Sequence, residues 1–290
     1  MDLPAGVGLE ALSPVVQSSP RARGVLTGIL DERQAVARYV FRRADLAPLG
    51  LSEPAGYTAL QRLEQAGRVA KVGSRHGIWL IVPPEYRDVG GPPAAWVLGD
   101  VMAAMDAPYY VGLRSAAEWL GATHHAVQTL QVVVGRQLRP FAIGRERLRF
   151  FEKRTAAATP TLLVPGQAAP LRMSTAGATA LDLVRFMVAS GGINAVAGVI
   201  AQIADRCTPD DLKLALDAAD DTPSAQRLGW LLSLLERRRL AATVAAWLRP
   251  RSSRVVPLEL GQRTGSDAAG RGAVDPAWRV AVHAEVNPML

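Results

Sequence analysis

The sequence has few of the residues that mark disulfide-bonded, metal-binding or covalent-catalytic proteins. Cys207 is the only cysteine, so no intramolecular disulfide can form. A chain without disulfides fits a reducing compartment, and we expect a cytoplasmic protein. The four histidines include one adjacent pair, His124 and His125. A polar loop suits this pair better than a metal site does, because neighbours in sequence rarely bind one ion.

Catalytic and cofactor-binding motifs are missing as well. The sequence contains no GxSxG, GxxxxGK[ST], HExxH or CxxC pattern. The acidic pairs Asp210-Asp211 and Asp220-Asp221 are expected at helix starts, where carboxylates stabilise the helix dipole. We therefore expect no enzymatic activity, no cofactor and no bound metal.

A membrane-spanning helix is not expected either. Residues 186–204 form a run of 19 residues without a charge, which is close to the length that crosses a bilayer. Gly191, Gly192 and Asn194 interrupt this run, because glycine favours a helix end and asparagine a helix start. The pattern predicts two helices, at about 175–190 and 194–205, and no membrane partner. The opening Met-Asp-Leu-Pro also lacks the basic and apolar segments of a secretory signal.

What the chain does have is enough apolar residues for a large core and an excess of arginine. Of its 290 residues, 49% are hydrophobic and 20% are charged, and the formal net charge is +7 with a pI of about 10.1. This balance suits an acidic partner such as nucleic acid or an acidic protein. An ordinary basic soluble protein has the same balance, so net charge alone does not decide between the two.

Composition divides the chain into an arm, two domains and a linker. Residues 1–20 are rich in Pro, Ser and Gly and are expected to form a flexible arm, and residues 90–93 (Gly-Gly-Pro-Pro) are expected to be a linker. The domains are 21–89 and 94–290. The predicted fold class is α+β: an N-terminal winged helix-turn-helix domain, followed by a larger mixed α/β domain with a small sheet and a helical bundle.

The second domain is predicted to contain helices, then strands, then helices again. Helices are expected at 94–106 and 113–121, and strands at 127–134, 138–143, 147–154, 159–165 and 169–174. From 174 to 249 the apolar spacing is helical, with N-caps expected at Ser174 or Thr175, at Thr208 and at Thr222. A late strand is expected within 278–286.

The first domain has the element order of a winged helix-turn-helix. Residues 31–41 predict a helix and 42–52 predict a short second helix. Ser52 is expected to cap a third helix, and residues 68–82 then predict a hairpin with a glycine-flanked basic turn. Three helices followed by a two-stranded ribbon is typical of this DNA-binding fold.

The third helix carries two different faces. Gly56, Leu60 and Leu63 recur at helical spacing and are expected in the core. The outward side chains can donate hydrogen bonds to base edges or phosphates, and a helix of this size fits the DNA major groove. The predicted DNA contacts are Tyr57, Thr58, Gln61 and Arg62 on this helix, Lys71, Arg75 and His76 on the hairpin, and Arg42 and Arg43 before the second helix. The alternatives are that this polar face serves solubility, or that the domain binds another protein.

The densest positive charge lies in residues 135–154. Seven basic residues against two acidic ones, Glu146 and Glu152, give this stretch a net charge of +5. In a strand, Arg145, Arg147 and Arg149 project from one face, where they repel one another unless an anion or a carboxylate is near. The predicted partner-binding basic face consists of Arg136, Arg139, Arg145, Arg147, Arg149, Lys153 and Arg154. The alternative is a solvated face paired with carboxylates from elsewhere, as we also expect for Arg237-Arg238-Arg239 near a helix C-terminus.

Two segments carry a family resemblance. They are FRRADLAPLGLSEPAGYTALQRLEQAGRVAKVGSRHGIWLI (41–81) and APYYVGLRSAAEWLGATHHAVQTLQVVV (107–134), and DPAWRVAVHAEV near the C-terminus adds to them. The second contains a Tyr-x-Gly-x-x-Ser-Ala motif formed by Tyr110, Gly112, Ser115 and Ala116. The chain resembles the AbiEi-type antitoxins of bacterial toxin–antitoxin systems.

The resemblance implies a specific set of partners. The winged helix would bind inverted repeats in its own promoter, with two copies of the chain on the DNA, and would repress transcription. The C-terminal domain would be required to counter a nucleotidyltransferase-fold toxin. Two other functions fit the residues: a winged-helix regulator whose second domain senses a ligand or binds a protein, and an RNA-binding protein that uses the basic strand face.

Overall fold

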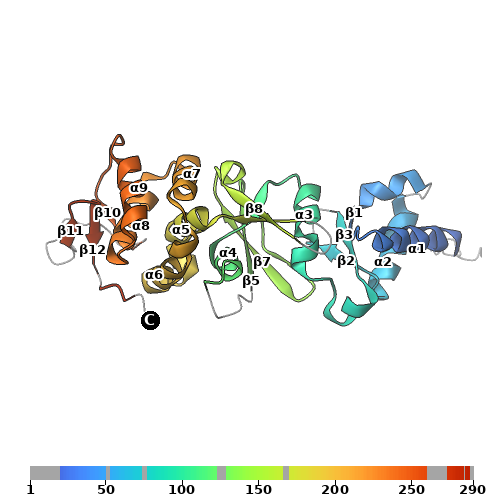
Figure 1. Ribbon diagram of the computed structural model, residues 1–290. Helices are drawn as coiled ribbons and strands as arrows, with labels where there is room; N and C mark the ends of the chain where they lie inside the picture. Colours follow the sequence, from blue (N-terminus) through green and yellow to red (C-terminus); the bar gives the residue numbers. More distant parts are fainter. Residues whose placement is uncertain are drawn as a thin grey trace, which may run out of the picture.

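The fold is seen in a computed structural model that describes residues 20–49, 53–73, 77–122, 129–165, 170–259, 273–283 and 285–287. Figure 1 shows the elements in succession along the molecule, with the N-terminal unit at one end and a six-stranded sheet in the middle. A helical bundle and a small sheet lie at the other end. The architecture is mixed α and β.

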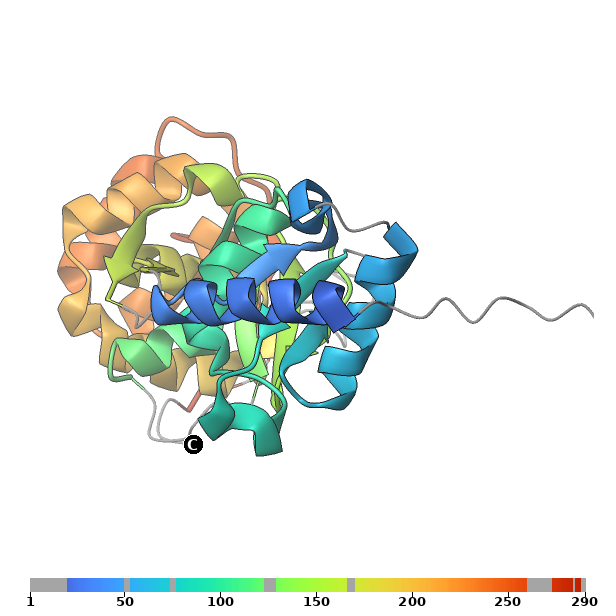
Figure 2. The same cartoon turned by 90° about the vertical axis from the view of Figure 1, so that its right-hand side faces the viewer.

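The described residues of the N-terminal unit form two α-helices, a 3-10 helix and three strands. In chain order these are α1 (Pro20–Ala35), β1 (Val40–Arg42), η1 (Arg43–Leu49), α2 (Glu53–Gln65), β2 (Val69–Val72) and β3 (Ile78–Ile81). The strands form an antiparallel sheet in the order β1-β3-β2. Figure 2 views the molecule from this end and shows α1 lying across it.

The predicted first helix, 31–41, is wrong in both bounds. Helix α1 starts eleven residues earlier, at Pro20, and ends at Ala35, after which Ala37 adopts a left-handed φ of 56°. Val40 and Phe41 lie in β1, where β-branched and aromatic side chains pack well. The short second helix is the 3-10 helix η1, and the third helix and the hairpin lie where they were predicted.

Both faces of the three-stranded sheet are covered. Trp79 and Ile81 of β3 pack with α1 and α2, whereas Ile78 and Leu80 face helix α3 (Ala94–Ala104). This alternation explains why all four residues of β3 are buried. Helix α3 also packs against the six-stranded sheet, so it lies between the two sheets.

The segment between the N-terminal unit and α3 is closely packed. It contains the 3-10 helix η2 (Pro84–Val89) and the residues expected as a linker. Gly91 and Pro92 are buried, and a Cβ on Gly91 would lie only 2.9 Å from the backbone nitrogen of Gly144. Glycine is therefore required there by the close approach of the two backbones.

The six-stranded sheet has the order β6-β7-β5-β4-β9-β8. Its strands are β4 (Tyr109–Val111), β5 (Thr129–Val134), β6 (Phe141–Ile143), β7 (Glu146–Glu152), β8 (Thr161–Val164) and β9 (Leu171–Ser174), with a 3-10 turn, η3 (Ala156–Ala158), before β8. The five predicted strands of this region are confirmed. The short strand β4 was not predicted, because three residues give too little pattern to separate a strand from a loop.

Helices cover both faces of this sheet. Leu98 and Met102 of α3 pack on one face, and α4 (Leu113–Trp119) and α5 (Ala176–Arg185) belong to the core on the other. The remaining elements are η4 (Met187–Ser190), α6 (Gly192–Ile203), η5 (Ala204–Arg206), α7 (Pro209–Ala219), α8 (Thr222–Leu234), α9 (Arg238–Leu248), β10 (Val256–Pro257), β11 (Ala273–Asp275) and β12 (Val280–Val282). The last three strands form a small sheet in the order β10-β12-β11.

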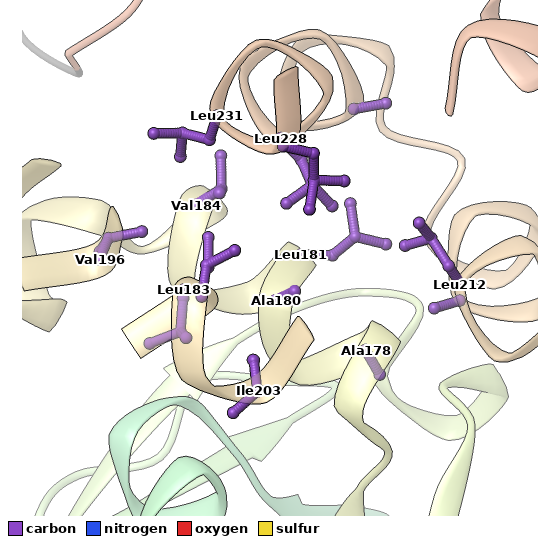
Figure 3. Close-up of a cluster of buried hydrophobic side chains, with 14 of the residues drawn as sticks. Ala178, Ala180, Leu181, Leu183, Val184, Val196, Ile203, Leu212, Leu228 and Leu231 are labelled. Carbon is purple, nitrogen blue, oxygen red and sulfur yellow. The ribbon is translucent and has the colours of Figure 1, made fainter. Parts of the chain in front are cut away.

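The bundle packs around α5. Figure 3 shows Leu181, Leu183 and Val184 of α5 surrounded by apolar side chains such as Ile203 of α6 and Leu228 of α8. Thr175 caps α5 and Thr208 caps α7, as predicted. The predicted cap at Thr222 is wrong, because the neighbouring carboxylate of Asp221 accepts the hydrogen bond from the Ser224 N–H.

The uncharged run at 186–204 is broken as predicted. Gly191 adopts a φ of 99° between η4 and α6, a conformation that favours glycine. Within the described ranges, no helix is long and apolar enough to cross a membrane.

Candidate nucleic-acid and partner surfaces

Helix α2 separates its apolar and polar residues as expected. Gly56, Leu60 and Leu63 are buried together with Ala59, and they hold the helix against α1 and the sheet. Tyr57, Gln61, Arg62 and Gln65 are exposed. Thr58 is half-buried and donates its hydroxyl hydrogen to the Pro54 carbonyl. The outer face of α2 therefore presents mostly neutral polar groups and one guanidinium.

Three cations predicted to contact DNA already have partners within the protein. Lys71 forms an ion pair with Glu64 at 2.9 Å, and its ammonium lies 4.9 Å from the Trp79 ring centroid. Arg43 pairs with Glu53. Arg42 donates hydrogen bonds to the carbonyl oxygens of Ala103 and Ala104 at the end of α3. Arg42 thereby joins the N-terminal unit to α3.

Three predicted residues cannot be placed. Arg75 and His76, at the hairpin tip, and the expected cap Ser52 lie outside the described residues. They remain predictions.

The basic face on β7 is exposed over its first half. Arg147 and Arg149 are exposed, and their neighbours on β5 are Thr129 and Gln131, which carry no charge. On the opposite side of the strand, Leu148 is buried among the residues that pack on α3. The predicted alternation along 145–150 is confirmed.

Most of the other arginines of this stretch lie on the surface as well. Arg136 donates to the Met105 carbonyl at 2.8 Å, and Arg145 donates to the Asp88 carbonyl at 3.3 Å. Arg139 and Arg154 are exposed. Among the residues that the structure describes, no carboxylate forms an ion pair with Arg147 or Arg149.

Lys153 is a correction, because it does not belong to this exposed face. Its side chain is only 3% exposed, and its ammonium lies 2.8 Å from a carboxylate oxygen of Asp182, which is 1% exposed. At the C-terminal end of β7, Phe151 also contacts the ring of Phe186, the residue that follows α5. On one side of β7 the side chains of Arg147 and Arg149 are therefore exposed, whereas Lys153, just after the strand, forms a buried ion pair.

Tyr110 completes this buried cluster. Its hydroxyl donates to Asp182 at 2.7 Å and accepts from Lys153 at 3.2 Å. Burial, and then the negative charge of Asp182, raise the pKa of Tyr110 far above its usual value, so its hydroxyl stays protonated. The three side chains come from β4, from the residue after β7 and from α5, and they connect the sheet to the bundle.

Sequence reasoning found the motif tyrosine but missed its partners. The available signal was Asp182, a carboxylate within the otherwise apolar stretch ALDLV (180–184). A charged side chain on the buried face of a helix requires an opposite charge and hydrogen bonds. The motif's Gly112 is needed because a Cβ would lie 2.9 Å from Val133, and Ser115 accepts a hydrogen bond from the Gln131 N–H.

The described residues contain no group of three or more His, Cys, Asp or Glu side chains that could hold a metal. Burial and the nearby Asp211 raise the pKa of the Cys207 thiol to about 12. At neutral pH this thiol is protonated and is a poor nucleophile.

The comparisons with known proteins identify the segment that contains this cluster. The family model of the AbiEi antitoxin C-terminal domain matches residues 110–234. Residues 110–234 are therefore similar to the C-terminal domain of the AbiEi antitoxins. The match begins at Tyr110 and includes β7, Lys153 and Asp182, so the AbiEi resemblance is confirmed and an antitoxin role is supported.

Two further comparisons complete this result. No curated protein sequence matches the chain. The crystal structure of the RV2827C protein from Mycobacterium tuberculosis has a similar fold, with a TM-score of 0.58 and 14% identity over 89% of this chain and 91% of that chain. At this identity the similarity shows the fold alone.

Proposed function

We propose that this chain belongs to the AbiEi antitoxins, is the antitoxin of a toxin–antitoxin pair and represses its own promoter. In this proposal residues 21–89 are a winged helix-turn-helix that binds inverted repeats in DNA, with two copies of the chain on one site. Residues 94–290 neutralise a nucleotidyltransferase-type toxin in the cytoplasm. The AbiEi match supports the antitoxin role, and the DNA-binding role depends on the N-terminal unit.

The observation that carries the DNA-binding proposal is the outer face of α2. Tyr57, Gln61 and Arg62 lie exposed on the side of α2 opposite its buried residues. The element order α1-β1-η1-α2-β2-β3, with β1 beside β3, supports the proposed winged helix, because that fold arranges its elements in the same way. Side chains of this kind on a helix can read base edges in the major groove.

The surface that best fits the toxin is the exposed half of β7. Arg147 and Arg149 lie within the matched antitoxin segment and have no carboxylate partner in the described structure. Arginine binds carboxylates through two parallel hydrogen bonds, so an acidic surface of the toxin would complement this face. RNA is the other anion that this face could take.

The test is fluorescence anisotropy of the full chain on DNA from upstream of its own gene and on a scrambled duplex, over a salt series. We expect tighter binding to the upstream DNA at every salt concentration. Equal, salt-sensitive binding to both duplexes would contradict sequence-specific repression. The full chain is required, because a fragment ending at residue 90 would expose Ile78 and Leu80, which α3 covers.

A further inference from the structure

A second concentration of arginine lies at the far end of the molecule from the N-terminal unit, in the turn between α8 and α9 (Figure 1). Glu236 adopts a left-handed φ of 58°, and the Arg237 N–H donates to the Leu232 carbonyl at 2.8 Å. These features end α8 abruptly. Three consecutive arginines, Arg237, Arg238 and Arg239, therefore follow the turn directly, and α9 begins at the second of them.

These arginines line a cavity of about 400 Å³, here named the arginine pocket. Its other wall is the connection between α6 and α7, which contributes Asp205, Cys207 and Pro209. The volume lies within the range of small-ligand sites, about 300–1,000 Å³. The space is larger than a single ion needs.

The first arginine is held in place by the protein itself. Arg237 pairs with Asp205 at 3.0 Å and donates to the Ala201 carbonyl at 3.1 Å. Its Nε atom is buried and has no hydrogen-bond partner among the residues that the structure describes. The guanidinium is therefore oriented in the pocket wall with one donor left unused.

The other two arginines are exposed and lack such partners. No carboxylate within the described ranges forms an ion pair with Arg238 or Arg239. Asp205 is already used by Arg237, and Glu236 is the other acidic residue of the pocket, so the lining carries three positive and two negative charges. Two guanidiniums remain available for a ligand.

Their position is also unfavourable without an anion. We expected this triplet near a helix C-terminus, where cations are stabilised, but Arg238 and Arg239 are the first two residues of α9. The first turn of α9 contains no acidic residue, and no side chain caps it. Adjacent positive charges at the positive end of a helix repel one another and the helix dipole.

We propose that the arginine pocket binds a phosphate group carried by a nucleotide-sized ligand. Arginine forks match the oxygens of phosphate, and the pocket has room for more than the phosphate alone. The group could come from a free nucleoside phosphate or from the phosphorylated end of an RNA. The role is binding only, because the lining contains no serine, threonine, lysine or histidine and the Cys207 thiol stays protonated at neutral pH. This site is separate from the proposed DNA and toxin surfaces.

The test is isothermal titration calorimetry of the full chain with ATP, inorganic phosphate, citrate and a 5′-phosphorylated single-stranded RNA. The variant is Arg238→Gln/Arg239→Gln, which changes two exposed residues and should leave the melting temperature unchanged. The matched control is Arg249→Gln, an exposed arginine at the other end of α9. The proposal is supported if a probe binds saturably and its affinity falls about tenfold or more in the double variant but not in the control.

The probes separate the two sources of phosphate. Loss of ATP or inorganic phosphate binding assigns the site to free phosphates, and loss of RNA binding alone assigns it to an RNA end. The proposal is overturned if no probe binds, if citrate binds as tightly as ATP, or if the control loses as much affinity as the double variant. Binding to upstream DNA should be equal in the double variant and the unaltered chain.

Discussion

The cations of the N-terminal unit and those of β7 differ in what they already contact. Arg43 and Lys71 are paired with carboxylates of the same unit. Arg147 and Arg149 lie beside uncharged Thr129 and Gln131 and form no ion pair within the described residues. Similar sequence patterns, basic residues on an exposed face, thus have different local environments.

This difference distinguishes cations that form ion pairs within the protein from cations that are available to bind a partner. A paired side chain must lose one contact to make another, so its net contribution to binding is small. An unpaired row of arginines repels itself and gains more from an incoming anion. We therefore expect β7 to bind its partner through charge, and α2 to read DNA mainly through neutral groups such as Gln61.

The largest effect is expected where the β7 face becomes buried. Lys153→Met should lower the free energy of unfolding by about 3–5 kcal/mol, because it leaves the Asp182 carboxylate buried without its cation. Urea denaturation followed by circular dichroism measures this. Arg147→Met, on the exposed half of the same strand face, is the matched control and should change stability by less than about 0.5 kcal/mol.

A double variant distinguishes a lost ion pair from a lost packing contact. Lys153→Met/Asp182→Leu removes both charges and should recover much of the stability lost in Lys153→Met. If the double variant is less stable than either single variant, packing around the cluster matters more than the pairing of its charges. An equal loss in Arg147→Met would remove the distinction between the two halves of β7.

The second largest effect is expected on toxin binding, from the unpaired Arg147 and Arg149. Charge reversal in Arg147→Glu/Arg149→Glu should weaken binding of the cognate toxin about a hundredfold, since attraction becomes repulsion. Surface plasmon resonance with the toxin measures this, with Arg249→Glu as a distant control. Binding to upstream DNA should stay intact. Loss of DNA binding, with toxin binding unchanged, would reverse the roles that we assign to the two surfaces.

A smaller effect is expected from a neutral residue of α2. Gln61→Ala should reduce the preference for upstream over scrambled DNA by about 1–2 kcal/mol, because a bidentate contact to a base is lost. Anisotropy on both duplexes measures this preference. Gln65→Ala changes a second exposed glutamine, the last residue of α2. It should have less effect than Gln61→Ala, because Gln65 lies one turn further from the start of the helix, and the start of a recognition helix contacts the bases. An equal loss of DNA preference in the two variants would contradict a helix whose N-terminal part faces the bases.

Local patterns sufficed for much of this fold. The spacing of Gly56, Leu60 and Leu63 predicted the buried side of α2, and the alternation around Leu148 predicted which arginines of β7 are exposed. Thr175 and Thr208 were identifiable as caps because a hydroxyl before a helix has a local function. In each case the determining contacts lie within a few residues in the sequence.

Contacts between segments that are distant in the sequence could not be predicted. Nothing near Lys153 indicates that α5 covers it, because its partner Asp182 is 29 residues away. The burial of Ile78 and Leu80 depends on α3, which follows the expected linker. The partners of Arg42 are likewise carbonyls 61 and 62 residues later in the chain. Such pairings require the tertiary structure.

The smallest effect is expected at Lys71, a cation that is already paired with a carboxylate within the protein. Lys71→Ala removes an ion pair whose two side chains are 39% and 35% exposed, so stability should fall by less than about 1 kcal/mol. If Lys71 keeps its contact with Glu64 on DNA, the slope of log affinity against log salt concentration should be almost unchanged. A slope smaller by about one unit would mean that Lys71 leaves Glu64 for a phosphate. Pairing in the free protein would then not exclude a cation from binding DNA, and Arg43 would need the same test.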